Sequence, residues 1–406
     1  MTERLAARSA ERRTGLGGSP RSVAALVALM LAAFCYLTVE LLPVGLLPVV
    51  AGDLGVSLAA VGLLVTGYGL TVAVASLPLT YLVRRVPRRQ LLSGLLAVFV
   101  VATCVAVTGG YGLLLAGRVA TALSQAVFWS VVAPAAAALF SPQVRGRVTA
   151  TLFGGGSLAT VLGVPTATWL GQQAGWRAAF LAVAGLGLLA LIGVAVLVPT
   201  STPEQGHAAT GSEPDARRYW LLIAATAVAI TGVFGAYTYI SPFLTEISGF
   251  SPQTISALLL VYGVAGLGGI AMGGVLADRA PRTAMLAPVA ILASALVALY
   301  LFGTSQAAAV VLVALWGFAM PQIPATFQNR VLHVAPGSTD LASAVFSATF
   351  NLGIAAGALI GGLLLSAIGV RSTYLAAGLL TVVAVAILLC EPIVARRHAA
   401  TDPHHD

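Results

Sequence analysis

Long runs of apolar residues, almost free of charges, recur about a dozen times along the chain, with short polar segments between them. Each run is long enough to cross the hydrocarbon core of a bilayer, roughly 30 Å thick, as an α-helix. The runs stay apolar throughout, whereas the strands of a membrane barrel alternate apolar and polar residues. The pattern predicts an all-α membrane protein with spans near 23–50, 59–82, 90–108, 112–139, 148–170, 178–198, 220–243, 252–276, 284–303, 307–328, 341–366 and 373–393.

Composition excludes a soluble protein, because 59% of the 406 residues are hydrophobic and only 8% are charged. A soluble domain has no way to bury so much apolar surface. The three cysteines, Cys35, Cys104 and Cys390, fall inside predicted spans without a second cysteine nearby, so we expect no metal site or disulfide. The first arginine-rich segment leads into a run too long for a signal peptide, so we expect it to be retained.

The basic residues predict the orientation of the chain in the membrane. All 21 are arginines, and cytoplasmic loops carry an excess of basic residues. With the N-terminus inside, every arginine lies in a cytoplasmic segment except Arg118, Arg177 and Arg371. Both termini are therefore predicted to be cytoplasmic in the cell membrane. The net charge of +8 has the same origin, so no nucleic-acid partner is expected.

An internal repeat divides the chain into two halves. An offset of 194 residues aligns Pro48 with Pro242, Gly55 with Gly249, and "GWRAAFL" from Gly175 with "GVRSTYL" from Gly369. Six spans per copy give both copies the same orientation, which is a parallel repeat. The predicted organisation is a disordered N-terminus (1–21), a six-helix bundle (22–198), a polar cytoplasmic linker (199–219), a second six-helix bundle (220–394) and a cytoplasmic tail (395–406).

Four motifs resemble the major facilitator superfamily, in particular its twelve-span drug:proton antiporter and sugar-efflux branch. They are "GVLADRAPRT" (274–283) with its first-half counterpart "TYLVRRVPRR" (80–89), "LLLAGRVATALSQ" around Arg118, "GSLATVLGVP" (156–165) and "TVELLPVGLLP" (38–48). The counterpart departs from the family pattern, since Arg84 stands where the family has an aspartate. The resemblance implies twelve helices, alternating access around a central site, and efflux driven by protons.

Glu40 and Arg118 are the two charges well inside predicted spans. Charges at membrane depth cost about 2.5–3.5 kcal/mol on insertion scales, so they usually face a cavity or a partner. At about 1.5 Å per residue, Glu40 lies about 15 Å and Arg118 about 9 Å below the outer ends of their spans. We expect Glu40 to carry the proton and Arg118 to modulate it. Two alternatives stay open: a permanent ion pair that fixes two helices, and a glutamate that snorkels outward.

Polar and aromatic residues at membrane depth are candidates for the substrate cavity. Gln125 and Trp129 share a helical face with Arg118. The second half supplies Tyr237, Tyr239, Gln322 and Asn351. Aromatic rings with a few amides suit an amphipathic organic ligand, although each residue alone is also explained by packing between helices.

The loops after the second and eighth spans are candidates for a cytoplasmic gate. The resemblance implies charge contacts there, which would involve Arg84, Arg85, Arg88, Asp278, Arg279 and Arg282. The simpler reading of "RRVPRR" is a topology signal. Gly156 begins the fifth-span motif. In the same span a stripe of small residues at a spacing of four allows close helix contact, either for static packing or for movement of the two halves: Gly155, Ala159, Gly163, Ala167 and Gly171. Pro165 removes a backbone hydrogen bond at the same place.

No Walker motif or zinc-binding H-E-x-x-H sequence is present, so we expect neither an enzyme nor a cofactor. The expected function is a monomeric, proton-coupled exporter of a small organic molecule embedded in the lipid bilayer. A proton-coupled importer of a small metabolite is the first alternative. A channel or a structural membrane protein is the second, disfavoured by the absence of rings of charged residues.

Overall fold

The computed structural model describes residues 19–83, 85–141, 144–200, 213–337 and 339–401, and within these ranges the chain is helical and has no strand. Twelve helices of this described part are long and apolar enough to cross a membrane. The all-α prediction and the number of spans are thereby confirmed, and the chain is a multi-pass membrane protein. Predicted and observed ends differ by a few residues for most spans. The largest difference is the last helix, which continues to Thr401.

By their internal contacts, the residues form two compact units, one of residues 1–42 and 74–205 and the other of 43–73 and 206–406. The boundary passes through the first two membrane helices. Residues 43–73, which cover the end of α2 (Pro20–Leu54) and most of α3 (Leu58–Val83), pack with the second unit. The predicted bundle boundaries at 22–198 and 220–394 follow the repeat along the sequence rather than these contacts.

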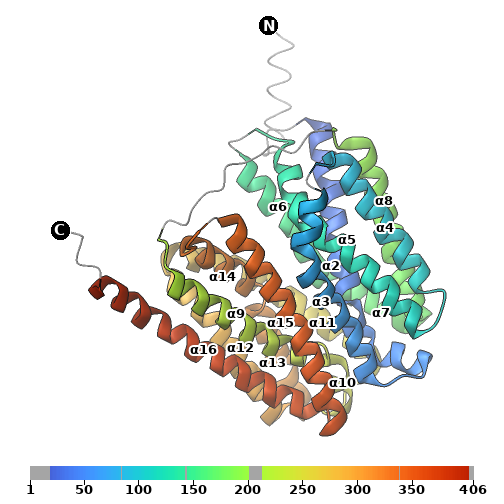
Figure 1. Ribbon diagram of the computed structural model, residues 1–406. Coiled ribbons are helices and arrows are strands. Elements are labelled where there is room, and N and C mark those ends of the chain that lie inside the picture. The colour runs from blue at the N-terminus through green and yellow to red at the C-terminus, as the bar shows by residue number, and fades with distance from the viewer. Residues whose placement is uncertain (1–18, 84, 142–143, 201–212, 338, 402–406) are drawn as a thin grey trace, which may run out of the picture. The chain divides into compact units, whose positions relative to one another are not determined.

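The first unit is built around a core of three neighbouring helices. Its α4 packs against both α5 and α8, and α7 packs against α8 (Figure 1). Largely apolar runs form the body of these helices, Pro134 lies inside α5, and Gly175 separates α7 from α8. The helices that complete this unit are α4 (Arg88–Ala106), α5 (Tyr111–Ala137), α6 (Arg145–Leu158), α7 (Val164–Ala174) and α8 (Trp176–Leu197).

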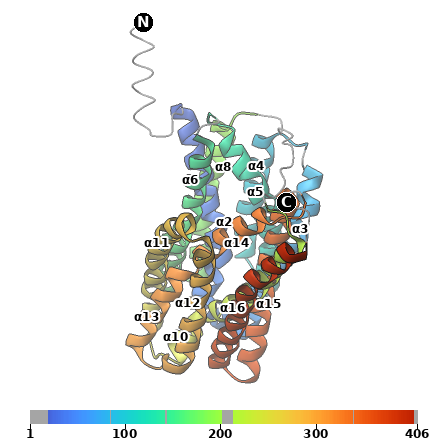
Figure 2. The same cartoon turned by 90° about the vertical axis from the view of Figure 1, so that its left-hand side faces the viewer.

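The second unit places α9 between α15 and α16, both of which it contacts along much of its length (Figure 1). In the same unit α11, α12 and α13 run side by side, and α12 also packs against α16 (Figure 2). Its helices are α9 (Ala216–Tyr237), α10 (Ile240–Glu246), α11 (Ile255–Arg279), α12 (Pro281–Phe302), α13 (Gln306–Ala319), α14 (Gln322–His333), α15 (Thr339–Ala367) and α16 (Val370–Thr401).

The backbone confirms the repeat at the predicted offset of 194 residues. The glycines with positive φ in the described residues are Gly55 and Gly249, at 63° and 70°, and Gly175 and Gly369, at 85° and 111°. Each pair is separated by 194 positions and ends corresponding helices. Because side chains rarely adopt this backbone conformation, the matching glycines indicate that both copies turn in the same way.

Three predicted spans are interrupted rather than continuous. The fifth contains a π-helical turn at Ala159–Gly163 just before Pro165. The seventh ends at Tyr237 and resumes as α10, and the tenth is divided between α13 and α14 next to Pro321. A proline cannot donate a backbone hydrogen bond and clashes with the preceding turn, so such breaks accumulate near prolines.

Candidate functional site

The two prolines of "TVELLPVGLLP" each leave a backbone carbonyl of α2 without its helical partner. In an α-helix the N–H of residue i donates to the carbonyl of residue i−4, and proline has no N–H. Pro43 therefore frees Val39, and Pro48 frees Val44. Both carbonyls are bonded from another helix: Arg118 Nη1 donates to Val39 O at 2.8 Å, and Ser241 Oγ donates to Val44 O at 2.8 Å.

Arg118 joins α5 to α2 through two adjacent carbonyls. Besides the bond to Val39, its Nη2 donates to Glu40 O at 3.0 Å. The planar guanidinium can serve both acceptors at once, which the single ammonium of a lysine does less well. Since Arg118 is only 2% exposed, these bonds hold a buried positive charge in a fixed position beside residue 40.

The Glu40 carboxylate is also buried, at 8% exposure, and accepts a hydrogen bond from Gln125 Nε2 at 2.7 Å. Arg118 and Gln125 lie seven residues apart on α5, two turns along one face. The seven-residue spacing agrees with the prediction that Gln125 shares a helical face with Arg118, and the structure adds that Gln125 bonds the Glu40 carboxylate. The two Arg118 bonds described above go to backbone carbonyls of α2, beside that carboxylate.

This arrangement suits a carboxyl group that gains and loses a proton. An ionised carboxylate only accepts hydrogen bonds, whereas the protonated acid also donates one. The Gln125 amide carries both a donor and an acceptor, so a rotation of the amide offers a partner to either form. The buried charge of Arg118 favours the ionised form, and burial opposes it. The local structure thus supplies both influences that a proton-carrying residue needs.

The fifth-span motif lies against the same part of α2. A Cβ atom added to Gly163 would collide with Thr38 and come within 3.0 Å of Phe34, and one added to Gly156 would lie 3.0 Å from Leu37. Small residues are therefore required where this helix meets α2 close to Glu40. Trp129, one turn after Gln125, stacks on Phe153 with ring centroids 5.9 Å apart. This ring pair lies one helical turn along α5 from the hydrogen bond between Gln125 and Glu40.

The four candidate cavity residues of the second unit occupy separate surroundings. Tyr237 belongs to a buried aromatic cluster with Tyr262 and Trp316, at centroid distances of 5.3 and 5.8 Å. Tyr239 is fully buried and donates its hydroxyl to Ala358 O at 2.7 Å. Their packing explains both tyrosines without a ligand.

The two amides of the second unit each donate to a backbone carbonyl four residues earlier in the chain. Gln322 Nε2 donates to Phe318 O at 2.8 Å, and Asn351 Nδ2 donates to Ser347 O at 2.9 Å. Among the described contacts, none joins these amides to each other or to the two tyrosines. Sequence analysis did not assign Tyr262 and Trp316 to the cluster of Tyr237. The signal in the sequence was that both are aromatic residues inside apolar spans, like Tyr237.

The candidate gate residues are only partly visible. Arg84 and the side chain of Asp278 lie outside the described residues. Arg85 and Arg279 are exposed, Arg88 is half-buried, and Arg282 lines a cavity in the second unit. Sequence analysis also missed Glu391, a 1% exposed carboxylate near the end of a span that pairs with Arg218 and Arg330. The available signal was an acid at the end of an apolar span, which needs a positively charged partner such as the arginines near the ends of two other spans.

Comparisons with known proteins agree with the twelve-helix fold. The sequence profile of the Major Facilitator Superfamily matches residues 29–339. The chain is 35% identical over 378 residues to the uncharacterized MFS-type transporter YtbD of Bacillus subtilis, covering 90% of this chain and 94% of that protein. It is 33% identical to a probable sugar efflux transporter of Mannheimia succiniciproducens, covering 86% and 88%. A probable sugar efflux transporter of Helicobacter acinonychis is 32% identical, covering 84% and 88%.

Solved structures extend the likeness to the fold. A bacterial homolog of the human lysosomal transporter Spinster, in an inward-facing and unoccupied conformation, superposes with a TM-score of 0.75 at 16% identity, covering 93% of this chain and 98% of that one. The human organic anion transporter MFSD10 (TETRAN) gives a TM-score of 0.67 at 16% identity, covering 91% and 100%. At this level of identity the likeness concerns the fold alone.

Proposed function

Because the chain belongs to the major facilitator superfamily, a family of transporters and not of enzymes, we propose that it is a proton-coupled exporter of small organic molecules. The cargo class that the relatives favour is a sugar or a similar polar metabolite, since two of them are named as probable sugar efflux transporters. The protein works as a monomer in the cell membrane, with both termini in the cytoplasm and alternating access to one central site.

The observation that carries the proposal is the buried Glu40 carboxylate with its partners Gln125 and Arg118. An acid at membrane depth is costly and is retained where it has a task. The carboxylate accepts a hydrogen bond from Gln125 and lies beside the Arg118 charge, so a change in hydration can shift the balance between its two protonation forms. Arg118 is a positioning residue here, since its bonds fix the α2 backbone that carries the acid.

The proposed cycle assigns one role to each residue. Glu40 takes up a proton when the site opens to the outside, and the neutral acid then allows the site to close. When the site opens to the inside, Glu40 releases the proton, and the ionised carboxylate is held by the Gln125 amide. Cargo binds in this ionised state and leaves when the next proton arrives from outside. Proton entry is thereby coupled to cargo exit.

The test is growth of an efflux-deficient bacterium that expresses the wild type, Glu40→Gln or Glu246→Gln, on a graded panel of toxic sugars, nucleoside analogues, dyes and antibiotics. Glu246 is the matched control, an exposed acid at the end of α10. We expect the wild type and Glu246→Gln to protect against some compounds and Glu40→Gln to give a roughly tenfold lower tolerance, because a glutamine side chain cannot carry the proton.

Everted membrane vesicles test the coupling directly. Cargo identified in the growth panel should dissipate a preset proton gradient with the wild type but not with Glu40→Gln, whose neutral side chain resembles the protonated state that releases cargo. Equal protection by the wild type and Glu40→Gln would mean that the protein is an exporter in which a group other than Glu40 carries the proton. Uptake of cargo down the proton gradient, instead of export against it, would replace the proposal with the importer.

A further inference from the structure

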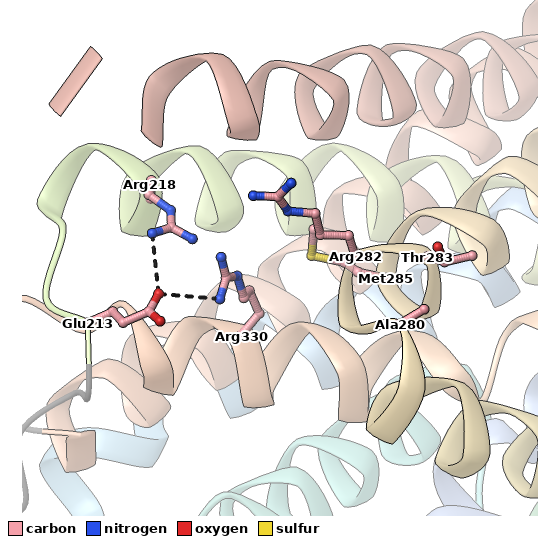
Figure 3. Close-up of a pocket in the computed structure, with 7 residues that line it drawn as sticks. All are labelled: Glu213, Arg218, Ala280, Arg282, Thr283, Met285 and Arg330. Atoms are coloured by element: carbon pink, nitrogen blue, oxygen red, sulfur yellow. Dashed lines mark ion pairs between the residues drawn. The ribbon is translucent and has the colours of Figure 1, made fainter. Parts of the chain in front are cut away.

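A second charged site, separate from Glu40, lies in the second unit where the start of α9, the start of α12 and the end of α14 meet (Figure 3). It is a cavity of about 540 Å³. The guanidinium groups of Arg218, Arg282 and Arg330 point into the same space (Figure 3). A cavity of this size is within the usual range for small-molecule sites.

Two of the arginines are held from behind by one buried carboxylate. Glu391 Oε1 accepts from Arg218 Nε at 2.9 Å, from Arg218 Nη2 at 2.7 Å and from Arg330 Nη2 at 2.8 Å. One negative charge thus faces two positive charges in a largely buried position, where an uncompensated charge is costly. Both arginines also line the cavity.

Glu213 supplies only a weak counter-charge on the open side. Its Oε2 lies 3.5 Å from Arg218 Nη1 and 3.9 Å from Arg330 Nη1 (Figure 3), both too long for hydrogen bonds. The Glu213 side chain is 62% exposed. Its backbone is fixed, because Glu213 N donates to His333 O at 2.9 Å, so the side chain can turn away while the segment stays in place.

Arg282 adds a third guanidinium group to the lining of the cavity. The lining thus contains three arginines and one acid, Glu213, while Glu391 pairs with two of the arginines from behind. The repeat accounts for Arg282, whose counterpart 194 positions earlier is Arg88, but not for the rest of the cluster, because Ala24, Ala136 and Leu197 stand at that offset before Arg218, Arg330 and Glu391. Arg218, Arg330 and Glu391 are therefore additions to the second unit.

We propose that this cavity binds a phosphate-bearing anion, with the headgroup of an anionic phospholipid as the favoured source and a free phosphate compound as the other. Arginine binds phosphate through two parallel N–H donors, and three guanidinium groups around one cavity match its tetrahedral oxygens. Arg218 and Arg282 are the third and second residues of their helices, and span ends lie at the depth of lipid headgroups. Bound phosphate replaces Glu213 as the partner of Arg218 and Arg330.

The test uses the full-length protein, purified in detergent and freed of lipid, and counts bound lipid by native mass spectrometry. Phosphatidylglycerol is compared with phosphatidylcholine for the wild type, Arg282→Gln, Glu213→Gln and Arg279→Gln. Arg279 is the matched control, an exposed arginine three residues before Arg282 that does not line the cavity. In a second arm, inorganic phosphate and glycerol 3-phosphate compete with the lipid.

We expect the wild type to bind phosphatidylglycerol more tightly than phosphatidylcholine. Arg282→Gln should bind phosphatidylglycerol about tenfold less tightly than the wild type, and Arg279→Gln should bind it with the affinity of the wild type. Glu213→Gln should increase the affinity severalfold, a gain that misfolding cannot produce. Binding of the soluble phosphates with the same order of variants, at the expense of the lipid, would identify a free phosphate as the ligand. Equal effects of Arg279→Gln and Arg282→Gln, or no preference for either phosphate probe, would overturn the proposal.

Discussion

Gln125 holds the carboxylate of Glu40 through a 2.7 Å hydrogen bond, and its removal separates the role of the bond from that of the acid. A hydrogen bond to a charged group is worth about 1.5–3 kcal/mol, and it favours the ionised carboxylate. In Gln125→Leu the proton is therefore released only at higher pH. We expect the pH profile of transport to move upward, with the cargo unchanged.

Transport in everted vesicles over a range of pH measures this shift. Thr121→Val is the control, because Thr121 lies one turn before Gln125, is buried, and bonds only the Gly117 carbonyl of its own helix. Its profile should coincide with that of the wild type. An active Gln125→Leu variant with an unshifted profile would exclude the amide from the coupling step.

At the scale of the element, α2 is a helix whose two prolines create acceptors for other helices. Ser241 on α10 fills the carbonyl that Pro48 frees. Ser241→Ala leaves this buried carbonyl unpaired, at a cost of about 1–3 kcal/mol. In a Pro48→Ala background the new N–H of residue 48 can bond the Val44 carbonyl. Ser241→Ala should then reduce the free energy of unfolding much less than it does in the wild type. The two changes are therefore expected to be non-additive.

Thermal unfolding in detergent of the wild type, both single variants and the double variant tests this interaction as a double-mutant cycle. Thr245→Ala serves as the control in place of Ser241→Ala, because Thr245 bonds carbonyls of its own helix. Its effect should be additive with Pro48→Ala. Additive effects of the serine and proline substitutions would show that Val44 finds another donor once Ser241 is lost.

At the scale of the whole molecule, alternating access requires helix contacts that form in one state and break in the other. In the second unit, α3 approaches α15 so closely that a Cβ added to Gly69 would lie 3.0 Å from Asn351 O and 3.2 Å from Ala355 N. These are backbone atoms, which cannot turn aside. Gly69→Leu should therefore favour the state in which the two helices are apart and reduce transport strongly.

Labelling of a cysteine at Ala59 reports this change, because Ala59 lies next to Gly362 of α15 in the present state. In a background without native cysteines, Gly69→Leu should make Ala59→Cys react several times faster with a membrane-impermeant thiol reagent. Gly94→Leu is the control, since a Cβ at Gly94 meets nothing within 4 Å. An unchanged labelling rate in active Gly69→Leu protein would mean that this contact does not open during the cycle.

The sequence by itself determined the all-α class, the twelve spans and the repeat. The physical reason is that lipid offers no partner for backbone groups, so the spans must be helical and apolar, which is visible in the order of residues alone. The paired glycines at Gly55 and Gly249 were visible for a similar reason, because a positive φ restricts the residue type locally.

The tertiary structure alone decided which partner each polar group has. Arg118 bonds Val39 and Glu40 across 79 and 78 residues, Ser241 bonds Val44 across 197, and Arg218 bonds Glu391 across 173. A freed carbonyl at a proline can be located in the sequence, but the donor that fills it depends on how distant helices pack. The Glu391 cluster was missed for the same reason: each of its charges lies near a span end, where it looks like a topology signal until the helices bring the charges together.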